Sequence, residues 1–431
     1  MRSFRPILTA LFVSWACACA PGPAREARAQ TPADTLDLDT CIRTALERQP
    51  SLRSAQASAA AAHARSGQAL SAALPQLSVD AALTRSGSPG LSVPGEVDAT
   101  NYSSAFSLRQ RVLDFGVTLG SIGSARASAQ AADQTARATR LDVIQGVESA
   151  YYGLLKTHRL VEVAEQARAQ QELHYKQAQA FFSVGTHPRI DVTTAEANLT
   201  SAELDLIKAR NNDRIAAVAL ASALGLDVEQ TPPIRDIHDS RVDSVDSKTS
   251  LAEAERSRPE LLAAEARVRA ARAAHTSARG DLLPTLDATI SYGWRGSEFP
   301  LDRAWSAGLS AGMPIFDGLF TVRRVQEASA NLQAAEFDYA DLRLKARQDV
   351  ESAVLNLNVA RDNLRVADQL LAEAQENFDV AEGRYRAGTG SIIEVTDAQV
   401  LLTTSRTQDV QARYDLQIAR STWLRALGRD R

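Results

Sequence analysis

Residues that form covalent cross-links or bulky aromatic cores are scarce in this sequence. Its 431 residues include three cysteines and two methionines, and aromatic residues make up only 5%. Cys17 and Cys19 lie in the N-terminal segment, whose removal would leave Cys41 alone and exclude an intrachain disulfide. The stability of the fold must therefore come from packing, and the recurrent alanines favour long, closely packed helices.

A surplus of charge of one sign is also absent. The chain carries 48 Lys and Arg residues against 52 Asp and Glu residues, mixed along its length, for a net charge of −4. Without a basic stripe for phosphate backbones, we expect no nucleic-acid partner. The histidines show no ligand spacing, and the sequence has neither a nucleophile elbow nor a phosphate-binding loop. We therefore expect no metal, no cofactor and no enzymatic activity.

Long hydrophobic runs are missing as well. No stretch reaches about 18 apolar residues, which excludes a membrane-spanning helix and leaves a soluble periplasmic protein or a membrane β-barrel. The N-terminal segment has the features of a signal peptide, with two arginines, an apolar stretch at residues 7–16 and a small-x-small pattern at residues 27–29. We expect cleavage after Ala29 and export. Lipid attachment at Cys17 or Cys19 is the alternative, although the residues before these cysteines suit it poorly.

What the sequence does contain is a repeat of about 200 residues. Pro50 and Pro259 lie 209 positions apart, as do Pro75 and Pro284 within matching Leu-Pro-x-Leu motifs. A Gly-Thr pair and the acidic residue after it recur at an offset of 203. A period of this length indicates a duplicated half-protein and not a solenoid. We expect a signal peptide at 1–29, structural repeats at 30–224 and 251–428, a connector at 225–250 and a tail at 429–431.

Each half contains two segments in which apolar and polar residues alternate. They cover about residues 76–84 and 102–112 in the first half, and 286–294 and 305–313 in the second. Each has the length of about 9 to 11 residues that a tilted strand needs to cross a bilayer. An edge of a soluble β-sandwich is the other interpretation, but four strands are too few for a sandwich in a chain of this length. We therefore favour membrane strands.

Uninterrupted helical patterns follow each strand pair, at about residues 118–182 and 321–385. At a rise of ~1.5 Å per residue, each helix would be about 100 Å long. Large residues recur every seven positions from Val350 to Tyr385, and small residues follow a parallel track from Ala353 to Ala381. Such tracks predict a coiled-coil seam, and shorter returning helices complete a long helical hairpin in each half. A further helix is expected from about Arg43 to Ala73.

Membrane strands impose a condition on assembly. An open sheet edge leaves backbone groups without partners in hydrocarbon, so a membrane sheet must close. The smallest bacterial barrels have about eight strands, so four strands per chain require at least two chains, and three chains would supply twelve. Because the long helices continue directly from the strands, they should extend the barrel as a second cylinder. The sequence thus predicts a mostly α fold with a membrane β-barrel, assembled as a conduit.

Several motifs resemble those of the TolC-type outer membrane efflux family. They are the segment from Leu38 to Pro50, Arg-Pro-Glu-Leu at 258–261, both Leu-Pro-x-Leu motifs, Pro314 to Gly318, and Tyr385-x-x-Gly388-Thr389 with Glu394-Val395. The resemblance covers nearly the whole chain after the signal peptide. It implies a homotrimer with a twelve-stranded barrel in the outer membrane, a twelve-helix α-barrel in the periplasm and an equatorial collar. The implied partners are a periplasmic adaptor protein, an inner-membrane transporter reached through the adaptor, and outer membrane lipid.

The function that this resemblance implies is an exit duct of a tripartite efflux or secretion system, which passively conducts substrates from adaptor and pump to the outside. A soluble periplasmic coiled-coil scaffold is the alternative, and it would lack amphipathic strands. A hydrolase attached to the envelope is opposed by the missing nucleophile motifs. The chain departs from the family at Arg111, where a proline often precedes the first strand-to-helix turn. The geometry of that turn is left open.

Both helical hairpin tips should lie at the far periplasmic end. By the resemblance, Tyr385, Glu394, Asp397 and Asp191 hold the closed aperture of a periplasmic gate. Copies of Glu394 and Asp397, which are one helical turn apart, would form an acidic ring in a trimer. Helix capping alone is the alternative role of these two carboxylates, because residues 391–394 match a capping box.

Another departure concerns the lock of this gate. Gly390 stands where some members of the family have an arginine that locks the aperture, so a different or weaker lock is implied. The two Gly-Thr turns are expected to contact the adaptor. They consist of Gly185, Thr186, Gly388 and Thr389.

Overall fold

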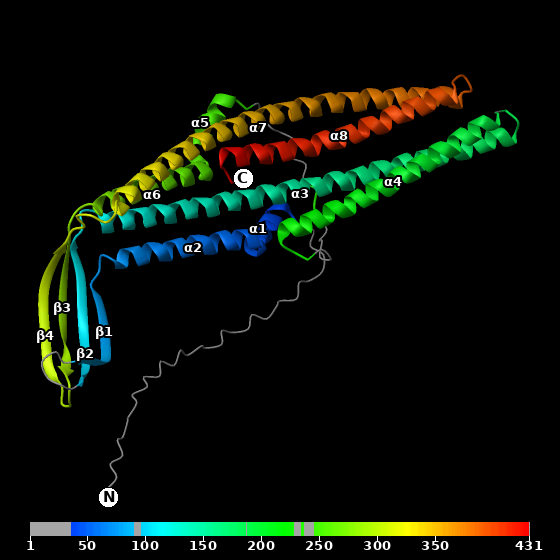
Figure 1. The fold of residues 1–431 in the computed structure, drawn as a ribbon. Helices are drawn as coiled ribbons and strands as arrows, with labels where there is room; N and C mark the ends of the chain where they lie inside the picture. Colours follow the sequence, from blue (N-terminus) through cyan, green and yellow to red (C-terminus); the bar gives the residue numbers. More distant parts are fainter. Residues whose placement is uncertain (1–35, 90–95, 187, 228–233, 237–244, 431) are drawn as a thin grey trace, which may run out of the picture.

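The structure is a computed structural model that describes residues 36–89, 96–186, 188–227, 234–236 and 245–430. The expected signal peptide, with Cys17 and Cys19, lies outside these residues. Figure 1 shows an elongated molecule with a small sheet at one end and two helical hairpins whose tips lie at the other end. The expectation of a mostly helical fold is confirmed.

The two halves of the chain contain the same six elements in the same order. The first half has α1 (Leu38–Arg48), α2 (Pro50–Ser71), β1 (Gln76–Pro89), β2 (Glu96–Leu113), α3 (Val117–Ser183) and α4 (Arg189–Leu224). The second half has α5 (Ser247–Ser257), α6 (Pro259–Gly280), β3 (Thr285–Gly296), β4 (Asp302–Gly312), α7 (Phe320–Arg386) and α8 (Ile392–Leu427). Both long helices therefore lie almost at their expected bounds, and α5 begins inside the segment expected to be the connector.

The prediction of one continuous helix from Arg43 to Ala73 is wrong, because the structure contains two helices there. Gln49 has φ −62° and ψ 119°, an extended conformation that separates α1 from α2. The cause is Pro50, whose ring disfavours the helical conformation of the residue before it and suits the first position of a new helix. Arg258 before Pro259 has almost the same conformation, φ −68° and ψ 116°.

The four strands form one antiparallel sheet in the order β1-β2-β3-β4. Its register places the apolar residues of the alternating segments on a single face, as in the row Val79, Phe106, Tyr292 and Trp305. The other face is polar, and the hydroxyls of Ser291 and Ser306 are 2.8 Å apart on it. Val79 is 62% exposed and Trp305 is 75% exposed, so the apolar face is uncovered within one chain.

Both strand-to-helix turns have the same aspartate cap. The backbone N–H of Thr118 donates to the Asp114 carboxylate at 2.8 Å, and that of Thr321 donates to Asp317 at 2.9 Å. These pairs lie 203 positions apart, so the sequence repeat is also a repeat of turn geometry. At the departure from the family, Arg111 forms an ion pair with Asp287 at 3.3 Å, and β2 continues through a register shift. The cap at Asp114 is nevertheless formed.

The predicted coiled-coil tracks are buried. Val350, Leu357 and Phe378 of α7 all pack in the interior, together with Ala353 and Ala374 from the small-residue track. α7 packs against α8, and α3 packs against α4 in the same way. These seams confirm the two predicted hairpins. Within the described part of the chain, no helix has both the length and the hydropathy needed to cross a membrane.

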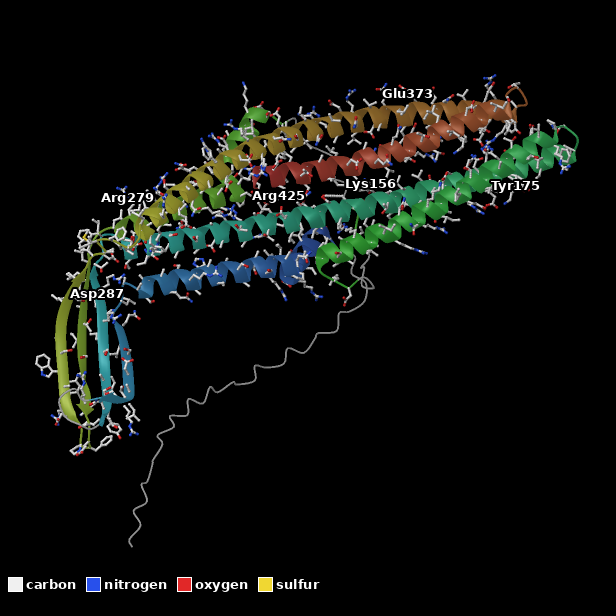
Figure 2. All side chains as sticks on the ribbon, viewed as in Figure 1. Lys156, Tyr175, Arg279, Asp287, Glu373 and Arg425 are labelled. Carbon is white, nitrogen blue, oxygen red and sulfur yellow. The ribbon has the colours of Figure 1, made fainter. Side chains whose placement is uncertain are left out.

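Ion pairs join the two hairpins where α3 and α8 lie side by side. Lys156 of α3 binds Asp415 of α8 at 2.9 Å, and Arg425 of α8 binds Asp142 of α3 at 2.6 Å. Figure 2 labels Lys156 and Arg425 at this contact, halfway along the molecule. Arg425 also pairs with Glu260 of α6, so a single guanidinium connects three helices.

A short part of the connector is held against the same region. Residues 234–236 lie beside the first described residues of the chain. Leu36 and Ile234 form a parallel β-bridge there. The Asp236 carboxylate accepts hydrogen bonds from Arg159 Nε of α3 and the Tyr414 hydroxyl of α8, both at 3.1 Å. The connector therefore binds both hairpins at mid-length.

Candidate functional site at the hairpin tips

The two hairpin tips have the same backbone conformation. Gly185 and Gly388 have φ values of 77° and 73°, in the left-handed region that favours glycine. The Thr186 hydroxyl donates to the Phe181 carbonyl at 2.9 Å, and the Thr389 hydroxyl donates to the Arg384 carbonyl at 3.2 Å. Each Gly-Thr pair thus closes the end of a long helix, and both expected contact turns lie exposed at one end of the molecule.

An aromatic contact connects the tips of the two hairpins. Tyr385, near the end of α7, is only 5% exposed and packs into the core between α7 and α8. Its ring meets Phe181 of α3 edge-on, with the ring centroids 6.0 Å apart and the planes at 75°. Burial raises the pKa of Tyr385, and the charge of Asp191 on α4 raises it further. Two of the predicted gate residues, Tyr385 and Asp191, are therefore close together.

The predicted acidic pair lies on the exposed side of α8. Glu394 forms an ion pair with Arg384 of α7 at 3.2 Å, and Asp397, one turn further on, is exposed. Ser391 caps the helix by accepting a hydrogen bond from the Ile393 N–H at 3.2 Å. The capping serine is thus present, while the carboxylate of Glu394 is directed to the opposite helix of the hairpin.

Gly390 lies close against the end of α7. A Cβ atom built on Gly390 would lie 3.1 Å from the Cβ atom of Arg384 and from the backbone nitrogen of Tyr385. These distances are shorter than ordinary van der Waals contact, so a larger side chain would have to push the end of α7 aside. The ion pair between Arg384 and Glu394 links α7 and α8 at this tip.

Three residues at the tips were missed by the analysis of the sequence. Phe181 and Arg384 follow no motif, and their roles depend on contacts between separate helices. His174 of α3 is buried, with Gln170 at 3.2 Å and Gln177 at 3.4 Å from its ring nitrogens. Burial lowers the pKa of His174, although Gln177 and the nearby charge of Glu382 on α7 favour its protonated form.

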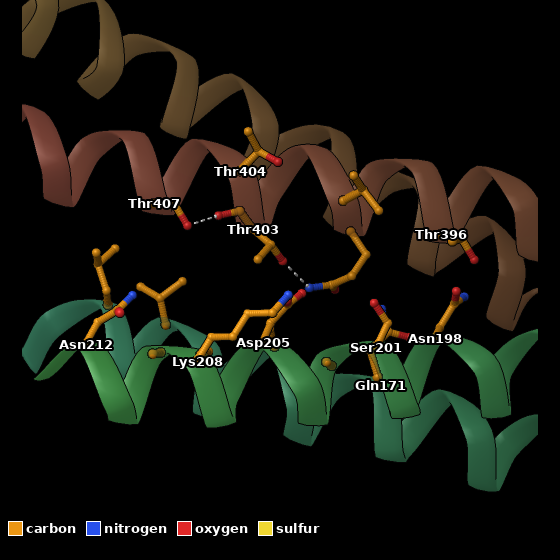
Figure 3. A pocket seen from close by; sticks show the side chains of 18 of the residues that line it. Gln171, Asn198, Ser201, Asp205, Lys208, Asn212, Thr396, Thr403, Thr404 and Thr407 are labelled. Carbon is orange, nitrogen blue, oxygen red and sulfur yellow. Dashed lines mark hydrogen bonds and ion pairs between the residues drawn. The ribbon is translucent and has the colours of Figure 1, made fainter. Parts of the chain in front are cut away.

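A pocket of about 490 Å³ lies along the hairpins between α3, α4 and α8. Figure 3 shows polar side chains of α4 and α8 facing each other across it. The hydroxyl of Thr407 donates to the Thr403 carbonyl at 2.9 Å, and Lys208 pairs with Asp205 at 3.2 Å. These groups satisfy one another along their own helices, an arrangement that offers no activated nucleophile.

The charged residues are not arranged for metal binding. The described residues contain no group of three or more His, Cys, Asp or Glu side chains that could hold a metal ion. Cys41 is buried in α1, and burial together with the charge of Asp37 raises the pKa of its thiol to about 11. A thiol with such a pKa is protonated at neutral pH and is a poor nucleophile.

Comparisons with known proteins give a consistent result. A family model described as "Outer membrane efflux protein" matches residues 41–226 and 251–429. Protein CyaE of Bordetella pertussis is 29% identical over 400 residues, which cover 90% of this chain and 81% of that protein. Outer membrane protein TolC of Escherichia coli K12 is 26% identical over 398 residues, which cover 88% of this chain and 79% of that protein.

The fold has a close counterpart among solved structures. The crystal structure of the Campylobacter jejuni CmeC outer membrane channel matches with a TM-score of 0.84 and 18% sequence identity. The match covers 91% of this chain and 85% of that one. Similarity of sequence and similarity of fold therefore extend over both halves of the chain.

Proposed function

This chain belongs to the outer membrane efflux protein family, lies in the outer membrane and extends into the periplasm, and we propose that three copies form the exit duct of a tripartite system. The TolC-type resemblance noted in the sequence is confirmed. Members of the family are channels and not enzymes. In the proposed duct, a periplasmic adaptor and an inner-membrane pump deliver substrates, which the channel conducts passively to the outside.

One observation carries this proposal: the sheet is exposed on both faces and unpaired at both edges. Its apolar face suits lipid, and its polar face suits a water-filled lumen. Among the described residues, β1 and β4 each pair with a single strand, and unpaired backbone groups are costly in hydrocarbon. We propose that β4 of one chain pairs with β1 of the next, which gives a closed twelve-stranded barrel from three chains.

The helices support the same assembly. α4 and α7 flank the packed helices, and each has an apolar stripe that no described element covers. Ile207 of α4 is 65% exposed and Val359 of α7 is 56% exposed. An exposed apolar stripe along a helix is typical of helices that pack against another helix. We propose that α4 of each chain packs against α7 of its neighbour, which closes a twelve-helix cylinder.

The tips form the proposed gate of this cylinder. Tyr385 and Asp191 would hold the two hairpins together near the aperture, while Glu394 and Asp397 would form an acidic ring around it. The contact of Tyr385 with Phe181 and its proximity to Asp191 support the first part. The exposure of both carboxylates on α8 supports the second. The exposed Gly-Thr turns, at residues 185–186 and 388–389, would contact the adaptor.

Two measurements test the duct and its ring. The full-length protein, purified in detergent, should be trimeric by light scattering and should conduct ions in a planar bilayer. Replacing both Glu394 and Asp397 by alanine should reduce the preference for cations, because three chains lose six carboxylates at the aperture. Replacing Glu196 and Glu203, acidic residues elsewhere on a tip hairpin, is the matched control. A monomer soluble without detergent would overturn the duct, and unchanged selectivity would overturn the ring.

A soluble periplasmic scaffold is not supported as an alternative. Its expected distinguishing feature was the lack of amphipathic strands, and four such strands are present. TolC of Escherichia coli and the CmeC channel are outer membrane proteins, which also favours the duct.

A further inference from the structure

We propose that the lipid-facing side of the sheet binds the phosphate groups of outer-leaflet lipids through Arg303 and Arg85. This inference rests on the proposed function, because it requires the sheet to lie in the membrane as a closed barrel. It concerns the lipid-facing side of the sheet, which does not conduct substrates. The argument depends on the register of the strands and on the chemistry of the two side chains.

Arg303 lies on the apolar face of the sheet and not on the polar one. In β4 it alternates with Trp305, Ala307 and Leu309, and the register places it directly opposite Trp294 of β3. Its neighbour in sequence, Asp302, points to the other face and pairs in register with Arg295 there. Arg303 is exposed and has no ion-pair partner among the described residues.

On β3 and β4, Trp294 and Arg303 mark the outer limit of the apolar positions. From Leu286 to Trp294 the apolar positions of β3 extend over nine residues, or about 30 Å of strand at ~3.4 Å per residue. Allowing for strand tilt, this matches the apolar band of about 25 Å on membrane barrels. Tyr292 and Trp294 pack edge-on at 5.7 Å on this face, as expected of aromatic residues near the headgroups.

The side of the membrane follows from the direction of the helices. α3 and α7 continue from the opposite end of the sheet and extend into the periplasm (Figure 1). The row of Arg303 therefore lies at the outward end of the barrel, at the level of the outer leaflet. The outer leaflet of this membrane consists of glycolipids that carry phosphate on their sugar headgroups. A long arginine side chain at this depth can place its guanidinium among these phosphates while its stem stays in the apolar layer.

Arg85 supplies a second cation on the other edge of the sheet. It alternates with Val79, Ala81 and Leu83 along β1, so it lies on the same apolar face. β1 and β4 are the two edge strands. Closure of the barrel would therefore bring Arg303 of one chain and Arg85 of the partner subunit to the same seam. Guanidinium groups bind phosphate with two parallel hydrogen bonds.

Lipid binding to the purified trimer tests this inference. Native mass spectrometry would compare binding of lipid A carrying two phosphates with binding of dephosphorylated lipid A. The wild-type protein should prefer the phosphorylated form. The double variant Arg303→Gln with Arg85→Gln should lose roughly fivefold in affinity for each arginine removed, since each cation near a charged lipid surface contributes about that factor. Replacing both by lysine should retain most of the preference.

The matched control removes the same charge from the opposite face. Arg109→Gln with Arg295→Gln alters two exposed arginines on the polar side and should leave the lipid preference unchanged. An unchanged preference in the Arg303 and Arg85 variant, or an equal loss in the control, would overturn the inference. Trimer mass and conductance are measured on the same samples. A wild-type protein that neither trimerises nor conducts contradicts the proposed duct, whereas a conducting trimer without the arginine effect contradicts this inference alone.

Discussion

Replacing Phe181 by alanine should open the proposed gate. The Phe181 ring is partly buried against the core between α7 and α8, and its partner Tyr385 lies in that core. The other neighbours of Tyr385 in this core, such as Phe378 and Val395, belong to its own hairpin and would move with it. Truncating Phe181 therefore removes the aromatic contact between the two hairpins and leaves each hairpin intact.

The size of the effect follows from this geometry. An edge-on aromatic pair contributes about 1 kcal/mol beyond burial, and half-burial of a phenylalanine ring contributes about as much again. A loss of about 2 kcal/mol corresponds to a roughly 30-fold shift toward a separated tip in each chain. Three chains that open together would multiply this shift, so that even a strongly closed aperture would spend measurable time open.

Single-channel recording in a planar bilayer measures the result. Phe181→Ala should raise the mean conductance or the fraction of time spent in the open state. Phe182→Ala is the matched control, because Phe182 is the next residue and is 46% exposed. If both variants open the channel equally, or if Phe181→Ala conducts like the wild type, the aromatic contact does not hold the gate.

Three further predictions concern stability and pH. Gly388→Ala should destabilise the protein by about 1 kcal/mol, because alanine at φ 73° is strained, whereas Gly383→Ala within α7 should stabilise it slightly; thermal melting that ranks them in the reverse order would contradict the turn geometry. Glu260→Gln should cost about 2 kcal/mol at neutral pH. Burial works to raise the pKa of Glu260, but the interaction with Arg425 outweighs burial, so the pKa is lowered. The stabilisation is therefore present above the unfolded pKa of about 4.3 and is lost as pH falls through the folded pKa. Acid titration of the melting temperature should therefore be flatter in this variant than in the wild type. His174→Gln should reduce the loss of thermal stability between about pH 7.5 and pH 5.5, because burial lowers the pKa of His174 and its protonation then opposes folding below about 6.5.

Much of the fold could be predicted from the sequence because long elements carry strong periodic signals. The seven-residue tracks from Val350 to Tyr385 lie within α7, and the alternating residues at 286–294 lie within β3. The break at Gln49 was missed although its signal was readable, since a proline restricts the residue before it. The helical composition on both sides of Pro50 obscures the local signal of the proline.

The candidate site was less predictable. Tyr385, Glu394, Asp397 and Asp191 were identified through a family resemblance, and the structure places them near the tip ends of α7, α8 and α4. Phe181 and Arg384 act through contacts between helices that are far apart in sequence or lie across a turn. A single sequence contains no periodic signal for such contacts. Packing alone makes these residues part of the site.

The unbroken length of α3 has a mechanical consequence. Its 67 residues form a lever arm of about 100 Å between the sheet and the hairpin tip, without a proline of the kind that separates α1 from α2. A rotation of about three degrees at its base would swing the far end by roughly 5 Å, on the order of one helical pitch. A small rotation at the sheet end would thus be amplified into a wide movement of the hairpin tip, without unfolding any helix.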